Sequence, residues 1–170
     1  MSATIETRTV RRLTIDIDAP FDDFRARYEA AAPAYDLQAR IPQLSNWDDV
    51  VADADKASST GFLRYASIEA TPVFAVAGHK ARSIVYLMGN HTIAETMYRH
   101  DPGIMLYAPL RLCLYEDLGG GVHLSIDQPG DQFGSFGNAD VAATGKLLDE
   151  KLAALLGGLG VAVPDSLTAA

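Results

Sequence analysis

The sequence has a single cysteine, Cys113, among its 170 residues. One cysteine excludes an internal disulfide framework and any zinc site built from several cysteines. No apolar run reaches the ~18 residues that a membrane-spanning helix needs. The first residues, MSATIETRTVRR, also lack the apolar core of a signal peptide. The sequence therefore predicts a cytoplasmic protein.

Basic residues are scarce as well. The chain has 14 lysines and arginines against 22 aspartates and glutamates, which leaves a formal net charge of −8 at pH 7. Nucleic-acid phosphates and anionic membrane surfaces are bound by basic faces, so this balance argues against both partners. With 48% apolar and 21% charged residues, the composition is typical of a globular protein, and the length favours one domain over residues 1–170.

The N-terminal part predicts a strand followed by a helix. Residues 8–18 alternate between apolar and polar side chains, and a period of two indicates a half-buried strand. Asp18 is a typical capping residue and stands just before Pro20, so a helix is expected over about 20–32. Its apolar side carries Phe21, Phe24 and Tyr28.

An extra helical and irregular segment is expected at about residues 33–60. Residues 33–44 are irregular but apolar enough to lie on the body of the protein. Ser45 and Asp48 have capping-box-like spacing ahead of a short helix over 46–57. That helix is expected to bury Trp47, Val50 and Val51.

The rest of the chain alternates between strand and helix signals. Residues rich in β-branched and aromatic side chains predict strands near 62–68, 72–78 and 82–88. Asn90, or alternatively Thr92, caps a helix that reaches about residue 100. A hairpin (110–117 and 122–127), a Gly- and Phe-rich loop (128–138) and an amphipathic helix (about 139–157) follow. This order has no regular β-α-β rhythm, which favours an α+β fold whose mainly antiparallel sheet has helices packed on one face.

Three short motifs resemble the DUF302 family, also called TT1751-like. They are Gly89-Asn90 before a helix, the strand from Pro109-Leu110-Arg111 to Tyr115-Glu116-Asp117, and the turn Asp127-Gln128-Pro129. The resemblance covers roughly residues 70–160, and His91 stands where many members have proline. It implies a TBP-like fold of β-α-β(4)-α type, often dimeric, and it implies no function.

Histidines are the candidate metal ligands. His79 follows an apolar stretch at an expected strand end, and His91 begins the helix after the Gly-Asn motif. Each borders an apolar element, so each is a candidate axial ligand for haem, with Arg82 or Arg111 available for a propionate. Glu95 stands four residues after His91, which is metal-ligand spacing. An exposed histidine beside a helix-stabilising glutamate is the plainer interpretation.

The hairpin is the second candidate site. His123, Ser125 and Asp127 alternate and project from one face of a strand. Neighbours at i and i+2 lie ~6–7 Å apart, which is too far for a catalytic triad. In the simplest hairpin register, the same face collects polar groups of the preceding strand. We therefore predict a ligand-binding set, with a solvated polar face as the alternative: Arg111, Tyr115, His123 and, from the apolar stretch 105–110, Tyr107.

Two further features each have two interpretations. Cys113 lies among leucines and is either a small buried filler or an iron–thiolate ligand. Phe133 and Phe136 stand among glycines, where they either anchor a connection or form a mobile flap. The segment has no P-loop lysine and no nucleophile elbow.

Three functions are consistent with these features. We favour a small-molecule-binding domain with an apolar pocket between sheet and helices, because the histidines lack tight ligand spacing. The alternatives are a haem- or metal-dependent enzyme and a homodimeric interaction module. The expected partners are thus a small-molecule ligand and a second copy of the chain, and haem is the leading cofactor if there is one.

Overall fold

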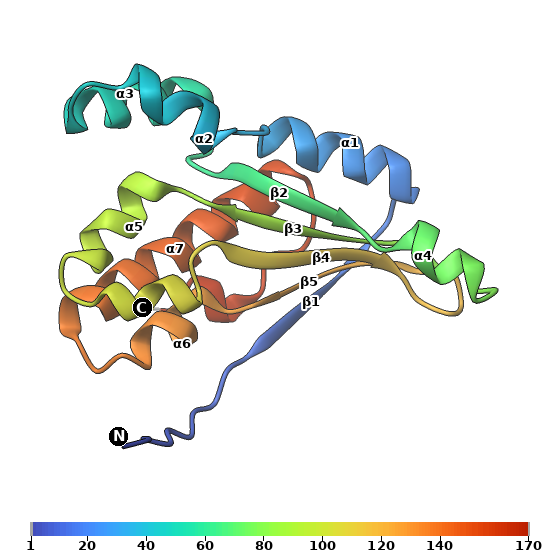
Figure 1. The fold of residues 1–170 in the computed structure, drawn as a ribbon. Coiled ribbons are helices and arrows are strands. Elements are labelled where there is room, and N and C mark those ends of the chain that lie inside the picture. Colours follow the sequence, from blue (N-terminus) through green and yellow to red (C-terminus); the bar gives the residue numbers. More distant parts are fainter. Residues whose placement is uncertain (1, 170) are drawn as a thin grey trace.

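The computed structural model describes residues 2–169, which are built around a five-stranded antiparallel sheet (Figure 1). The strands are β1 (Arg12–Ile17), β2 (Leu63–Glu69), β3 (Ser83–Gly89), β4 (Leu110–Glu116) and β5 (Val122–Asp127). Their order across the sheet is β1-β5-β4-β3-β2, and β4 and β5 form the predicted hairpin. The α+β prediction is confirmed.

Helices fill the connections between the strands. In chain order they are α1 (Phe21–Ala31), α2 (Leu37–Arg40), the 3-10 turn η1 (Ile41–Gln43), α3 (Trp47–Ala57), α4 (Thr71–Val76), α5 (His91–Tyr98), the 3-10 turn η2 (Pro102–Leu106), α6 (Pro129–Gly134), α7 (Ala139–Gly158) and the 3-10 turn η3 (Asp165–Leu167). Figure 1 shows α7 running along the sheet, with α5 and α6 near one end of it and α4 at the other end. No helix of the described chain is long and apolar enough to cross a membrane.

One face of the sheet forms the main core. Apolar residues alternate along each central strand, and their buried members, such as Leu112, Leu114 and Leu124, share this face. They pack in one cluster with α1 and α7, and that cluster draws on residues from Leu13 to Leu167. Full burial of an aliphatic or aromatic side chain contributes about 1.5–3 kcal/mol, so this face stabilises the fold. The predicted apolar stripes of α1 and α7 are confirmed.

The opposite face of the sheet is open over much of its area. The register sets Val85, Cys113, Ser125 and Thr14 in one row across β3, β4, β5 and β1. Thr14 is exposed and the other three are partly exposed, whereas core-facing neighbours are buried. The helices α1 and α7 therefore cover one face and leave polar and mixed side chains on the other.

The extra segment adds a small second cluster beside the sheet. Tyr35, Ala54 and Leu63 are buried together there. The Tyr35 hydroxyl donates to Asp53 at 2.6 Å, and Arg40 donates to the other oxygen of the same carboxylate at 2.6 Å. This carboxylate holds α2 and α3 together at one end of the sheet.

Several local predictions are wrong. Residues 72–78 contain the helix α4 rather than a strand, because Pro72 suits a first helical turn and Val73 and Phe74 find no place in the sheet and stay exposed. The strand predicted from residue 8 begins only at Arg12, since the backbone N–H of Arg11 bonds the Asp131 carboxylate at 2.8 Å instead.

The predicted caps and one burial prediction also need correction. The cap position of α1 is Pro20, without a side-chain bond, so Asp18 caps nothing. Asn46 rather than Ser45 caps α3, where its side chain accepts the Asp49 N–H. Trp47 is 45% exposed because the buried side of α3 is carried by Ala54. Asn90 caps α5 as predicted.

The segment predicted as a loop over 128–138 contains the short helix α6. Phe133 is buried in the main core and Phe136 packs against that core. The backbone of α6 comes very near α7 at Gly145, where an added Cβ would lie 3.3 Å from the Cα of Gly130. The segment is therefore anchored to α7 at Phe133, and Phe136 packs against Tyr107.

Candidate functional site

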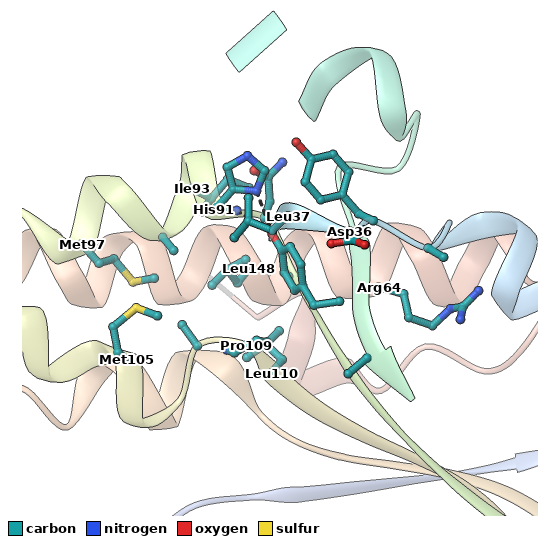
Figure 2. Close-up of a pocket in the computed structure, with 18 of the residues that line it drawn as sticks. Asp36, Leu37, Arg64, His91, Ile93, Met97, Met105, Pro109, Leu110 and Leu148 are labelled. Carbon is teal, nitrogen blue, oxygen red and sulfur yellow. Dashed lines mark hydrogen bonds between the residues drawn. The ribbon is translucent and has the colours of Figure 1, made fainter. Parts of the chain in front are cut away.

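A pocket of about 700 Å³ lies where α2 and α5 meet the end of the sheet (Figure 2). We call it the α2–α5 pocket. Its lining extends down to the core residues Leu148 of α7 and Phe133 of α6, and pockets of roughly 300–1,000 Å³ are typical of small-molecule sites. Most of the lining is apolar, including Leu37, Ile93, Met97, Met105, Pro109 and Leu110.

His91 and Tyr65 form the hydrogen-bonded wall of the pocket. The Tyr65 hydroxyl accepts the backbone N–H of His91 at 2.9 Å and lies 2.9 Å from the Nδ1 atom of the same residue. We assign the hydroxyl proton to this second bond, which leaves the ring proton on Nε2. Burial lowers the pKa of His91, and this effect outweighs the negative charge of Asp53, which raises it. The imidazole is therefore neutral at pH 7.

Tyr35 extends this wall toward α3. Its ring lies 5.3 Å from the His91 ring, centroid to centroid. Burial and the hydrogen bond to Asp53 raise the pKa of Tyr35 to about 12. The Nε2 atom of His91 is buried and has no hydrogen-bond partner among residues 2–169. The wall is thus a fixed aromatic surface of three rings.

The two predicted metal ligands lie in different places. His91 lines the α2–α5 pocket, whereas His79 follows α4, is exposed, and lies beside Phe74 rather than at a strand end. Glu95 forms an ion pair with Arg99 instead of joining His91. The described residues contain no cluster of three histidine, cysteine or acidic side chains that could hold a metal ion. As the side chains lie, His91 offers iron no accessible free nitrogen, since Nδ1 is bonded and Nε2 is buried.

Of the predicted ligand-binding residues, Arg111, Tyr115 and His123 lie on the open face of the sheet and Tyr107 directly follows η2, and the four form two groups. Arg111 and Tyr107 line a second hollow of about 400 Å³. Tyr115 and His123 pair in register farther along β4 and β5, with ring centroids 5.3 Å apart. The hairpin strands therefore pair in the simplest register, while the four residues do not meet in one pocket.

We call the second hollow the open-face hollow. Arginines from three segments contribute to it, together with the carboxylate of Asp127. Cys113 is in its lining too, and burial raises the pKa of that thiol, as expected for a filler rather than a thiolate ligand. The full lining is Arg8, Arg12, Leu87, Leu106, Tyr107, Pro109, Arg111, Cys113, Ser125, Ile126, Asp127 and Gln132.

His123 sits between two carboxylates. Its Nδ1 lies 2.8 Å from Asp16 and its Nε2 lies 3.0 Å from Asp117. The hydrogen bond to Asp117 and then the one to Asp16 raise the pKa of His123, because only the protonated ring can donate to both. This arrangement ties β1, β5 and the hairpin turn together.

The raised pKa of His123 predicts a pH-dependent stability. The folded protein binds this proton more tightly than the unfolded chain, so the stabilisation is complete below about pH 6.5 and is lost as pH rises through the folded pKa. We expect the wild type to lose stability relative to His123→Gln across that range in urea unfolding. His79→Gln, at an exposed histidine outside this arrangement, is the control for removal of a histidine. A constant difference between wild type and His123→Gln would contradict the prediction.

The sequence signals did not reveal most of the α2–α5 pocket. Tyr35, Leu37 and Tyr65 carry no motif. Tyr65 belongs to β2, and Tyr35 and Leu37 come beside it because Ala34 forms a β-bridge with Arg64. The stretch 105–110 was a usable signal, since it supplies Met105, Pro109 and Leu110 to the lining. Met97 of α5 also lines the pocket, whereas Tyr98 of the same helix is exposed.

Comparisons with known proteins agree with the fold. A family model described as "Domain of unknown function DUF302" matches residues 43–159, more than half of the chain. The crystal structure of an uncharacterized conserved DUF302 protein from Bacillus stearothermophilus has a TM-score of 0.63 at 13% identity, covering 87% of this chain and 97% of that chain. No curated protein gives a match. By the family match, the chain belongs to the DUF302 family.

Proposed function

We propose that the protein binds a small, mainly apolar molecule in the α2–α5 pocket. The observation that carries this proposal is the depth of an apolar hollow of about 700 Å³, whose lining runs from the surface helix α2 to the core. A ligand that covers this lining is held by the burial of apolar surface, which contributes about 25 cal/mol per Å². The pocket therefore favours a ligand with an extended apolar body.

The lining also supports a polar group at one end of that ligand. Figure 2 shows Asp36 and Arg64 on one side of the pocket and Met97 and Met105 on the other. Thioether side chains are flexible and polarizable, so the methionine side adapts to apolar groups of different shape. Asp36, Gln38 and Arg64 of the lining supply hydrogen-bond donors and acceptors. The expected ligand has an apolar body and one uncharged hydrogen-bonding group.

Filling the pocket tests this proposal. The neutral apolar dye Nile red is the probe, and its fluorescence is titrated with the protein. Ala94 of α5 lines the pocket, so Ala94→Trp should occupy it and weaken dye binding at least tenfold. Tyr98→Trp is the matched control, because Tyr98 is exposed on the same helix and the substitution should leave binding unchanged. Circular dichroism checks that both variants are folded.

Two outcomes would overturn the proposal. The wild type would show no saturable dye binding, or Ala94→Trp would bind the dye as tightly as the wild type. The haem enzyme and the homodimeric module remain predictions that native mass spectrometry of freshly purified protein separates. A non-covalent adduct with the mass of haem supports the first, and a dimer without adduct supports the second.

A further inference from the structure

The open-face hollow carries a local charge opposite to that of the whole chain. We propose that this hollow binds a small dianion, of the phosphate or dicarboxylate type. In the part of the chain that the structure describes, its lining has three arginines and one carboxylate. The chain as a whole has a formal net charge of −8, so the positive excess is confined to a small area. The charged residues are Arg8, Arg12, Arg111 and Asp127.

The single carboxylate does not neutralise the arginines. Arg12 pairs in register with Asp127, and the Arg12 Nε atom lies 3.7 Å from its Oδ1 atom. Arg111 flanks Asp127 from the other side, because Leu112 pairs with Ile126 in the adjoining strands. Arg111 is exposed, and the structure gives it no ion pair within residues 2–169. The hollow thus keeps an excess of two positive charges, the number that a dianion neutralises.

Arg8 is held over the hollow by an aromatic ring. Its guanidinium carbon lies 4.0 Å from the centroid of the Tyr107 ring, and its Nη1 lies 3.4 Å from the Ser135 hydroxyl. A cation over an aromatic face is attracted by the ring quadrupole. Tyr107 is in turn fixed by edge-to-face packing with Phe136 at 5.8 Å. The three arginines therefore come from three separately anchored places: the N-terminal segment, β1 and β4.

The chemistry of the lining suits an oxyanion. A guanidinium group presents several N–H donors in a planar fork that matches carboxylate and phosphate oxygens. The floor between the arginines includes the Ser125 hydroxyl and the apolar side chains of Leu87 and Cys113. An apolar floor displaces water, which strengthens the attraction between the guanidinium groups and an anion.

This hollow is separate from the α2–α5 pocket, so the inference does not rest on the proposed function. The segment 105–111 contributes side chains to both and separates them. Met105, Ala108 and Leu110 line only the pocket, Leu106, Tyr107 and Arg111 line only the hollow, and Pro109 lies between the two and lines both. Filling the pocket with Ala94→Trp is therefore expected to leave anion binding unchanged.

Isothermal titration calorimetry tests the inference, with inorganic phosphate and succinate titrated separately into the protein at low ionic strength and pH 7.5. We expect saturable binding of at least one dianion, weakened at least tenfold in Arg111→Gln and also weakened in Arg12→Gln. The dianion that binds more tightly indicates whether the ligand is of the phosphate or the dicarboxylate type. Added sodium chloride should weaken binding, because salt screens exposed charges.

Arg99→Gln is the matched control. Arg99 is an exposed arginine at the C-terminal end of α5, where it pairs with Glu95. It does not line the hollow, so its loss should leave anion binding unchanged. The inference is overturned if neither dianion binds the wild type, if both hollow variants bind as the wild type does, or if Arg99→Gln weakens binding as much as Arg111→Gln.

Discussion

Replacing Asp149 by alanine is expected to lower the free energy of unfolding by about 2–3 kcal/mol. Asp149 of α7 is 6% exposed, and its carboxylate accepts the Gly130 N–H at 2.8 Å and the Gln128 side-chain amide at 2.7 Å. Gln128 also donates to the backbone oxygen of Ser166 at 2.9 Å. Alanine leaves the partly buried Gly130 N–H unpaired and removes the hydrogen bonds that join α7 to the start of α6. Urea unfolding measures the loss.

Asp149→Asn separates the hydrogen bonds from the charge. It keeps an oxygen for the Gly130 N–H, so its loss should be smaller than that of the alanine variant. Burial raises the pKa of Asp149, so the folded state binds this proton more tightly than the unfolded chain. The wild type should therefore lose stability relative to Asp149→Asn as pH rises from about 4 through the raised pKa. An alanine variant as stable as the wild type would contradict the assigned role.

Asp149 also shows why part of the core could not be predicted. The sequence places an aspartate within an amphipathic helix, where a charged residue normally marks the solvent side. Its partners Gln128 and Gly130 stand about twenty positions earlier, so no local pattern pairs them. The leucines of the same helix were predictable, because their spacing alone fixes a common side. Periodicity thus identifies an apolar stripe and misses a buried polar contact.

The hairpin strands could be predicted because their signals are local in the sequence. The pocket could not be predicted because its residues come from distant segments. Alternation within residues 110–117 and 122–127 is local, so the two strands and the faces of their side chains could be predicted. The register between the strands is set by pairing across the hairpin, and the sequence left it open. The α2–α5 pocket is assembled from segments around residues 35, 65, 91, 108 and 148. The first four segments contribute four to six residues each, while α7 contributes Leu148 alone and α6 contributes Phe133 alone. No single stretch of sequence therefore contains enough of the pocket to be recognised.

The helix α4 shows tertiary context overriding propensity. Four of its six residues (TPVFAV) are β-branched or aromatic, which favours a strand when no position in the sheet is considered. The edge strand β2 already pairs with β3, and the chain between them needs a short connection. A proline in the first turn makes a helical connection the better solution. The exposed Val73 and Phe74 are the cost of this connection.

Phe133→Ala is expected to cause the largest loss of stability, about 3–5 kcal/mol. Phe133 is 1% exposed and lies between α6 and α7, where its Cβ would be 3.0 Å from a Cβ added at Gly145. Its ring also packs edge-to-face with Tyr107 at 6.5 Å. Removing the ring leaves a cavity that the close backbones of α6 and α7 cannot fill by moving together. Urea unfolding of the variant measures the loss.

The same variant connects the core to the proposed binding site. Phe133 lines the α2–α5 pocket, so its removal joins the new cavity to that pocket and enlarges it. Nile red should then stabilise Phe133→Ala at least as strongly as the wild type, because a ligand that binds only the folded state adds stability in proportion to RT ln(1 + [L]/Kd). Phe136→Ala is the control, since Phe136 is only partly buried and does not line the pocket. Two results would show that Phe133 does not bridge the core and the pocket. In the first, Phe133→Ala loses no more stability than Phe136→Ala. In the second, the dye stabilises the wild type and leaves Phe133→Ala unaffected.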